Sequence, residues 1–148
     1  MGFLGACVAA ILLVACSGSE SSSTGPVTQK SPTGSYTISS INASPLPVAI
    51  FSDTGGFKLE VTSGTITLTS GGTYSIVTNY RETLPGVLDT YTDSTGGTWA
   101  MTSGTSTVVF TNSADTTQDQ ATWTNGTLTF VEPGVSPPQI TFVYKLKS

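Results

Sequence analysis

Few side chains in this sequence are suited to catalysis. The 148-residue chain contains no histidine, and both of its cysteines lie within the first sixteen residues. A serine or threonine nucleophile would therefore need a lysine or a carboxylate as its base. Lys58 and Glu60 alternate with apolar neighbours and are expected to face solvent, and Arg81-Glu82 is expected to form a surface pair of little energetic weight. We predict that the protein is not an enzyme.

Carboxylates that could bind a metal occur as two pairs that are close in sequence, Asp89 with Asp93 and Asp115 with Asp119. Calcium prefers oxygen ligands of this kind. Neither pair lies in a loop punctuated by glycine, as a calcium loop would be. We interpret both pairs as turn residues and solubilising charges, and we expect neither a metal ion nor another cofactor.

Aromatic side chains are the one feature that could mark a binding site. If they point inward, Trp and Tyr would also offer polar tips to orient a ligand. The candidate ligand-binding residues are Tyr74, Trp99, Trp123, Phe142 and Tyr144. Two interpretations stay open: the rings line a cavity for a small apolar ligand, or they fill the core.

The elements that must position these rings are strands. From Gly34 onward, apolar residues recur at every second position, as with Tyr74, Ile76 and Tyr80 and most clearly over residues 140–146. Turn signals separate the runs: Asp53-Thr54-Gly55-Gly56, Ser70-Gly71-Gly72, Pro85-Gly86, Ser94-Thr95-Gly96-Gly97, Asn125-Gly126 and Pro133-Gly134. We predict an all-β fold, an antiparallel up-and-down meander of about 8–10 short strands that forms a barrel, with a β-sandwich as the alternative.

A short motif recurs along these runs. Thr62-Ser63-Gly64-Thr65 resembles Thr102-Ser103-Gly104-Thr105, and Thr124-Asn125-Gly126-Thr127 is a third copy. A glycine between strand formers is typical of a bend or a hairpin turn, which would suit a closing barrel. The alternative is that threonine-rich strands look alike by composition.

The composition also limits the partners. Charged residues make up only 9% of the chain, so threonine and serine supply the polarity, which suits pleated strands. The net charge is −4 and the five basic residues are scattered. A nucleic-acid surface needs clustered Lys and Arg, so nucleic acid is excluded as a main partner.

The first sixteen residues combine an apolar run with a cysteine. Residues 2–14 are almost wholly apolar but fall short of the about 20 residues that span a bilayer. Leu13-Val14-Ala15-Cys16 resembles the lipobox of bacterial lipoproteins. The resemblance implies a signal peptide over residues 1–15 and acylation, for example by palmitate, at Cys16. Signal peptides normally begin with positive charge, but no charged residue precedes Cys16, so either the true start lies upstream or the export signal is weak. The alternative to a signal peptide is a buried N-terminal helix or strand in an unprocessed protein.

Residues 16–33 would then form a lipidated cysteine and a flexible tether rich in Ser and Thr, with too few apolar residues to repay ordering. Two or more acyl chains give stable attachment to a membrane. An Asp directly after the lipidated cysteine would resemble a signal that retains lipoproteins in the inner membrane, but this position is Ser17. We therefore expect a lipid-anchored protein of the bacterial cell envelope, at the outer membrane.

The segment 34–148 resembles the barrel domain of lipocalin-like bacterial lipoproteins. The opening of that family reads G-x-Y and then V-N-G-x-x-L-P. It is similar here to Gly34-Ser35-Tyr36 and to Ile41-Asn42-Ala43-Ser44-Pro45-Leu46-Pro47. Three later segments are also similar to the family: Ser63-Gly64-Thr65-Ile66-Thr67-Leu68, Gly72-Thr73-Tyr74-Ser75 and Phe142-Val143-Tyr144. The resemblance implies an up-and-down barrel that can hold a small apolar ligand. Tyr36 departs from the G-x-W of a typical lipocalin, and the short domain could have a filled interior.

Two functional hypotheses follow. The first is a membrane-anchored, monomeric lipocalin-like module that binds a small hydrophobic ligand, and it predicts an enclosed apolar pocket with a few polar groups. The second is a non-enzymatic structural or protein-interaction module of the envelope, and it predicts a filled core and an exposed apolar patch.

Overall fold

The computed structural model describes residues 31–132 and 139–148. The predicted signal peptide, the lipidation site Cys16, most of the tether and the turn at Pro133-Gly134 lie outside the described residues. Ser31–Ser148 forms one compact unit. In its described part the regular elements are antiparallel strands: β1 (Gly34–Ile41), β2 (Val48–Ser52), β3 (Lys58–Leu68), β4 (Thr73–Leu84), β5 (Val87–Met101), β6 (Thr107–Asn112), β7 (Gln118–Thr124), β8 (Thr127–Glu132) and β9 (Ile140–Leu146).

The alternation of apolar and polar residues explains these strands, because successive side chains of a strand point to opposite faces. In β3, Ile66 and Leu68 are buried while Thr67 between them is exposed. In β4, Tyr74 and Ile76 point to the same inner face, with Tyr80 further along. The predicted period of two is therefore confirmed, and it assigns one face of each strand to the interior.

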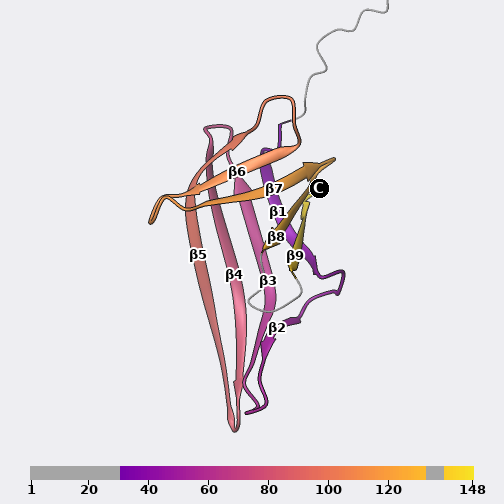
Figure 1. Cartoon of the computed structure of the whole chain (residues 1–148), viewed down its shortest axis with the longest axis vertical. Helices are drawn as coiled ribbons and strands as arrows, with labels where there is room; N and C mark the ends of the chain where they lie inside the picture. Colours follow the sequence, from indigo (N-terminus) through magenta and orange to yellow (C-terminus); the bar gives the residue numbers. More distant parts are fainter. Residues whose placement is uncertain (1–30, 133–138) are drawn as a thin grey trace, which may run out of the picture. The chain divides into compact units, whose positions relative to one another are not determined.

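The strands form a closed barrel. Each strand from β3 onward pairs with its chain neighbour, and β9 returns to β1. The pairing of β1 with β3, from Gly34 opposite Leu68 to Thr37 opposite Thr65, closes eight strands into an up-and-down barrel. The barrel prediction is confirmed, and the β-sandwich alternative is wrong because no pair of separate sheets faces each other in the described part of the chain. Figure 1 shows the long β3, β4 and β5 running the length of the unit.

Closure is limited to one half of the barrel. The residues of β3 from Thr65 to Leu68 pair with β1, whereas those from Lys58 to Val61 pair with the ninth strand, β2. Likewise β5 pairs with β6 only from Gly97 to Met101, although its ladder with β4 extends down to Val87. We call the half around β2 and the β4–β5 hairpin the open end, and the half with Gly34 and Leu68 the closed end; Figure 1 shows the hairpin extending beyond the other strands.

The closed end is filled by side chains. Tyr36, Ile66, Val108, Phe110 and Leu128 are each at most 1% exposed. Burying a side chain of the size of Leu or Phe stabilises a fold by about 1.5–3 kcal/mol. A row of rings continues from this core toward the open end, with centroid distances of 5.1 Å for Tyr74–Phe110, 5.1 Å for Phe110–Phe130 and 5.8 Å for Phe130–Tyr144.

One predicted turn is part of a strand. Ser94-Thr95-Gly96-Gly97 lies inside β5, and Gly97 forms the first pair with β6, opposite Asn112. A Cβ atom at Gly97 would collide with the carbonyl oxygen of Thr111, so this glycine allows two backbones to approach closely where the sheet begins to close. The prediction of a turn is wrong here because a glycine pair serves close packing as well as turning.

The charged residues of β3 and β4 also differ from expectation. Glu60 was expected to face solvent, but it is only 5% exposed. Its carboxylate lies 2.7 Å from Lys58 Nζ and 2.7 Å from Arg81 Nη2, since Arg81 is directly opposite Glu60 in the ladder. Arg81 therefore pairs across strands rather than with Glu82. Hydrogen bonds from Lys58 and then Arg81 lower the pKa of Glu60 below its usual value.

Candidate ligand-binding cavity

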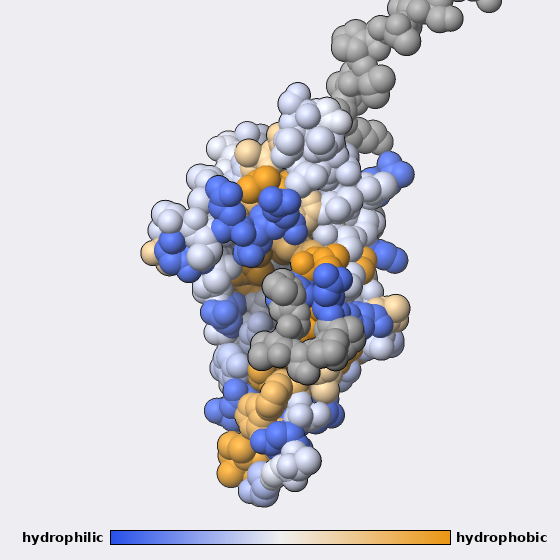
Figure 2. Space-filling view, in the orientation of Figure 1, coloured by the Kyte–Doolittle hydropathy of each residue, from blue (hydrophilic) through white to orange (hydrophobic). Residues whose placement is uncertain are grey.

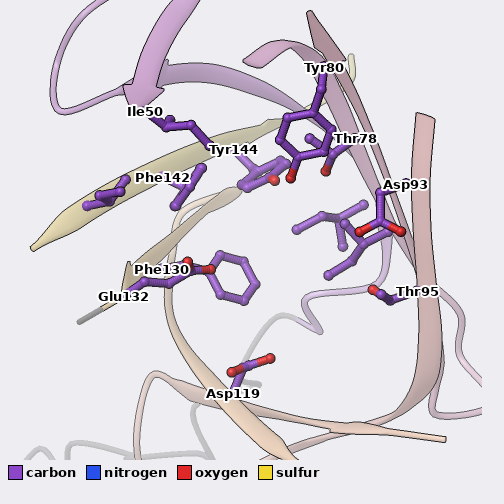
Figure 3. Close-up of a pocket in the computed structure, with 13 residues that line it drawn as sticks. Ile50, Thr78, Tyr80, Asp93, Thr95, Asp119, Phe130, Glu132, Phe142 and Tyr144 are labelled. Carbon is purple, nitrogen blue, oxygen red and sulfur yellow. The ribbon is translucent and has the colours of Figure 1, made fainter. Parts of the chain in front are cut away.

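A cavity of about 250 Å³ lies in the barrel at the open end. Strands β2, β3, β4 and β5 supply one wall and β7, β8 and β9 the other, so the cavity occupies the space that the partial closure leaves (Figure 3). The lining residues are Ile50, Ile66, Ile76, Thr78, Tyr80, Asp93, Thr95, Asp119, Phe130, Glu132, Ile140, Phe142 and Tyr144.

The floor of the cavity is apolar and is continuous with the core. Ile66, Phe130 and Tyr144 are buried members of the core cluster, and Ile76 and Phe142 pack against them. Strand register explains the grouping, since Ile66 pairs with Ile76 and Phe130 pairs with Phe142. Cross-strand partners share one face of a sheet, so both walls direct apolar side chains inward.

The rim of the cavity is acidic. Asp93 of β5, Asp119 of β7 and Glu132 of β8 are exposed side chains that line the cavity. Figure 3 shows the carboxylates of Asp93 and Asp119 extending from different strands toward the same space. Partial desolvation by its neighbours, and then the charge of Asp119, raise the pKa of Glu132 above its usual value. None of the lining residues is basic.

The hydroxyl groups of Thr78, Tyr80 and Tyr144 form another polar part of the cavity lining. Tyr80 and Tyr144 lie close to Thr78 in Figure 3. Burial raises the pKa of Tyr144 to about 12, and burial also raises the pKa of Tyr80. Both phenols therefore stay protonated in neutral solution and can donate a hydrogen bond. Tyr80 in turn stacks on Tyr91 of β5, with ring centroids 5.1 Å apart and planes 20° from parallel.

Two of the five predicted ligand-binding residues line this cavity. Phe142 and Tyr144 come from β9 and face the cavity side by side with Phe130. Tyr74 does not line it: its ring packs edge-on against Phe110 in the core. Ligand binding by Phe142 and Tyr144 stays a prediction.

The two tryptophans also lie outside the cavity, at the closed end. The indole Nε1–H of Trp99 donates to the carbonyl oxygen of Thr69 at 3.1 Å, and that of Trp123 donates to the hydroxyl of Tyr36 at 3.0 Å. Both polar tips are thus engaged within the protein. We therefore assign the tryptophans to closing this end rather than to the cavity.

Sequence reasoning missed the acidic rim. Asp93 and Asp119 were assigned to turns, yet both lie in strands, at positions whose alternation directs them inward. The available signal was their position in the period-two alternation, because residues two apart in a strand point to the same face. Asp93 is two residues from Thr95, which lines the cavity, and Asp119 is two residues from the buried Ala121. Asp115, in contrast, is a turn residue as expected, since its carboxylate accepts a hydrogen bond from Thr117 N at 3.0 Å.

No group of three or more His, Cys, Asp or Glu side chains is placed to hold a metal ion in residues 31–132 and 139–148. Over the same residues, no helix has the length and apolar character needed to cross a membrane. The cavity, with an apolar floor and polar groups at its rim, has the composition of a small-molecule site.

No protein-family model, curated protein or solved structure matches this chain. The likeness to a lipocalin-like barrel thus rests on the topology, an eight-stranded antiparallel up-and-down barrel with a ninth strand at the open end. One fold hosts many unrelated functions. Function must therefore be inferred from the side chains of the cavity.

Proposed function

We propose that the protein is a membrane-anchored, lipocalin-like lipoprotein that binds a small, largely apolar ligand in the cavity at the open end. The observation that carries this proposal is the cavity itself, whose apolar floor continues the core and whose polar groups are the carboxylates of the rim and a few hydroxyls. Ligand sites of soluble proteins share this division, in which apolar walls give affinity and a few polar groups give orientation.

The size of the cavity limits the ligand. Its volume of about 250 Å³ is near the lower end of small-molecule sites, which start at about 300 Å³. An apolar cavity of about 150 Å³ already accepts benzene. We therefore expect a single substituted ring or a short alkyl chain, and not the long acyl chain of a whole lipid.

The membrane anchor is a separate part of the proposal. It rests on the similarity of Leu13-Val14-Ala15-Cys16 to a lipobox and on the hydroxyl-rich segment that follows. A lipidated Cys16 would hold the barrel at the envelope membrane while the tether lets it project from the surface. The ligand would then be a molecule of the envelope or one passing through it.

Filling the cavity tests ligand binding. Ile76→Phe places a larger side chain in the floor, whereas Val77→Phe adds the same ring at the next position, on the opposite face of β4. With 1-octanol as the probe, isothermal titration calorimetry should give an affinity that Ile76→Phe lowers about tenfold or more and Val77→Phe leaves unchanged. Equal affinity of both variants, with unchanged circular dichroism, would contradict binding in this cavity.

One observation favours a second function, that of a protein-interaction module. Phe51, Leu84, Val87 and Leu88 are between 44% and 67% exposed at the tip of the open end, and Figure 2 shows hydrophobic surface there. A photoreactive residue at position 88 in living cells should then cross-link one protein. The same residue at the exposed Thr98, at the other end of β5, serves as the control. No adduct from position 88, or equal adducts from both, would argue against this function.

A further inference from the structure

We propose that the ligand of the cavity is an organic cation, an amine whose apolar body lies on the floor and whose ammonium group lies at the rim between Asp93, Asp119 and Glu132. This inference rests on the proposed binding function and names the class of ligand. It differs from the neutral or acidic lipid that an apolar barrel alone would suggest.

Charge segregation is the first observation that supports it. The lining contains three carboxylates and no cation. The basic side chains of the described residues lie elsewhere. Lys58 and Arg81 contact Glu60 on the opposite face. Lys145 is the strand neighbour of the inward Tyr144, so it points outward, and Lys147 lies at the closed end, where its backbone N–H donates to Ser35 O. No basic residue of the described barrel therefore neutralises the rim.

The same face of the open end continues this pattern toward the tip. Glu82 of β4 and Asp89 of β5 are directly opposite each other in the ladder. They lie two residues from Tyr80 and Tyr91, so the two pairs are on the same face of the sheet. Like charges placed opposite each other destabilise a sheet. The stacked rings of Tyr80 and Tyr91 lie between this pair and the Asp93 rim. A cation near these groups would relieve the repulsion and could also contact the face of a ring.

The shape of the site distinguishes an organic cation from a metal ion. The carboxylates come from three separate strands, and no cluster of metal ligands exists in residues 31–132 and 139–148. A small inorganic ion would also leave the apolar floor exposed to water. An amine with an alkyl or aryl body covers the floor and places one charge among dispersed carboxylates, whereas a fatty acid would bring a like charge to the rim.

A series of three probes of equal length separates these possibilities. n-Octylamine, 1-octanol and octanoate carry a positive charge, no charge and a negative charge at neutral pH. Calorimetry of the purified protein at low ionic strength should show that octylamine binds about tenfold more tightly than octanol, since each of three exposed charge pairs contributes about 0.5 kcal/mol. Octanoate should bind most weakly.

Two double variants locate the charge effect. Asp93→Asn with Asp119→Asn removes two rim carboxylates, and Asp53→Asn with Asp115→Asn removes two carboxylates from turns outside the cavity lining. Both variants change the net charge equally, and Asn retains an acceptor for each turn. The rim variant should lower octylamine affinity about fivefold and leave octanol affinity unchanged. The turn variant should match the original protein with both probes.

The outcomes separate the two proposals. Equal affinities for octylamine, octanol and octanoate would overturn the inference of a cationic ligand and leave ligand binding supported. Preference for octylamine that both double variants reduce equally would also overturn it, because the effect would come from net charge. Failure of all three probes to bind would overturn the proposed binding function, and the inference with it.

Discussion

Glu60 and Glu132 are two carboxylates that the fold perturbs in opposite directions. Glu60 forms ion pairs with Lys58 and Arg81, whereas Glu132 lies at the acidic rim of a cavity that no basic side chain lines. Accordingly, hydrogen bonds from Lys58 and Arg81 lower the pKa of Glu60, whereas desolvation and Asp119 raise the pKa of Glu132. Each shift is also a statement about stability, because a group that is easier or harder to ionise in the folded state links folding to pH.

Removing the charge of Glu132 should stabilise the fold. Its raised pKa means that ionisation costs free energy in the folded state, and this cost is present above the raised pKa and absent below the ordinary pKa of a glutamate. Glu132→Gln should therefore raise the Tm at pH 7, and the gain should disappear as the pH falls below about 4. A gain that persists at low pH would show that the effect is not electrostatic.

Removing the charge of Glu60 should have the opposite effect. Its lowered pKa contributes stability above the ordinary pKa of a glutamate, and this stability is lost as the pH falls through the lowered value. Because Lys58 and Arg81 are 46% and 36% exposed, water screens the pairs, and Glu60→Gln should cost only about 1 kcal/mol in urea unfolding at pH 7. Destabilisation of equal size at pH 3 would contradict this.

Cys16 carries the proposed anchor. Cys16→Ser removes the thiol that would be acylated, so the protein should leave the membrane fraction of cells and lose the mass of its acyl chains. Cell fractionation with mass spectrometry measures both. Cys7→Ser is the matched control and should remain in the membrane fraction. If the Cys16 variant has the same mass and partitioning as the original protein, the lipidation site is elsewhere or does not exist.

At the scale of elements, the junction between β5 and β6 decides whether the barrel closes. Gly97→Ala would press its Cβ atom against the backbone of Thr111 and force the two strands apart. We expect this substitution to destabilise the protein by about 2–3 kcal/mol in urea unfolding. Gly71→Ala is the control, since a Cβ atom there would meet nothing closer than 3.7 Å and should change stability by less than about 0.5 kcal/mol. Equal effects would show that the contact at Gly97 is not limiting.

The recurring Thr-Gly motif has a different structure in its different copies. Its first copy, around Gly64, lies inside β3, whereas the copies around Gly104 and Gly126 lie in turns. The copies thus have no common place in the fold. The interpretation that threonine-rich strands look alike by composition is therefore the better one.

For the barrel as a whole, the acidic rim of the cavity and the basic residues that lie away from it create an electric field whose effect should depend on salt. The Debye length falls from about 30 Å at 0.01 M to about 3 Å at 1 M ionic strength. The ratio of octylamine affinity to octanol affinity should therefore fall toward one as sodium chloride rises over this range. Calorimetry at three salt concentrations measures the ratio. A constant ratio would mean that the preference comes from hydrogen bonding alone.

The all-β class could be predicted from the sequence, because period-two alternation and turn residues act locally. Each strand needs only its own residues to define an inner and an outer face. This rule placed Tyr74, Ile76 and Tyr80 on one face of a strand, and in the structure all three belong to the core or pack against it. The choice of a barrel over a sandwich depended instead on the pairing of β1 with β3, whose residues are about thirty positions apart along the chain.

The position of the cavity and the residues that line it depend on the three-dimensional arrangement of the strands. Closure along half of β3 and β5 leaves the open end, and this brings together Asp93, Asp119 and Glu132 from three strands. Their proximity is a property of strand register and partial closure, which no local pattern encodes. For the same reason the sequence grouped Trp99 and Trp123 with Tyr144, although the register places the tryptophans at the closed end and the tyrosine at the cavity.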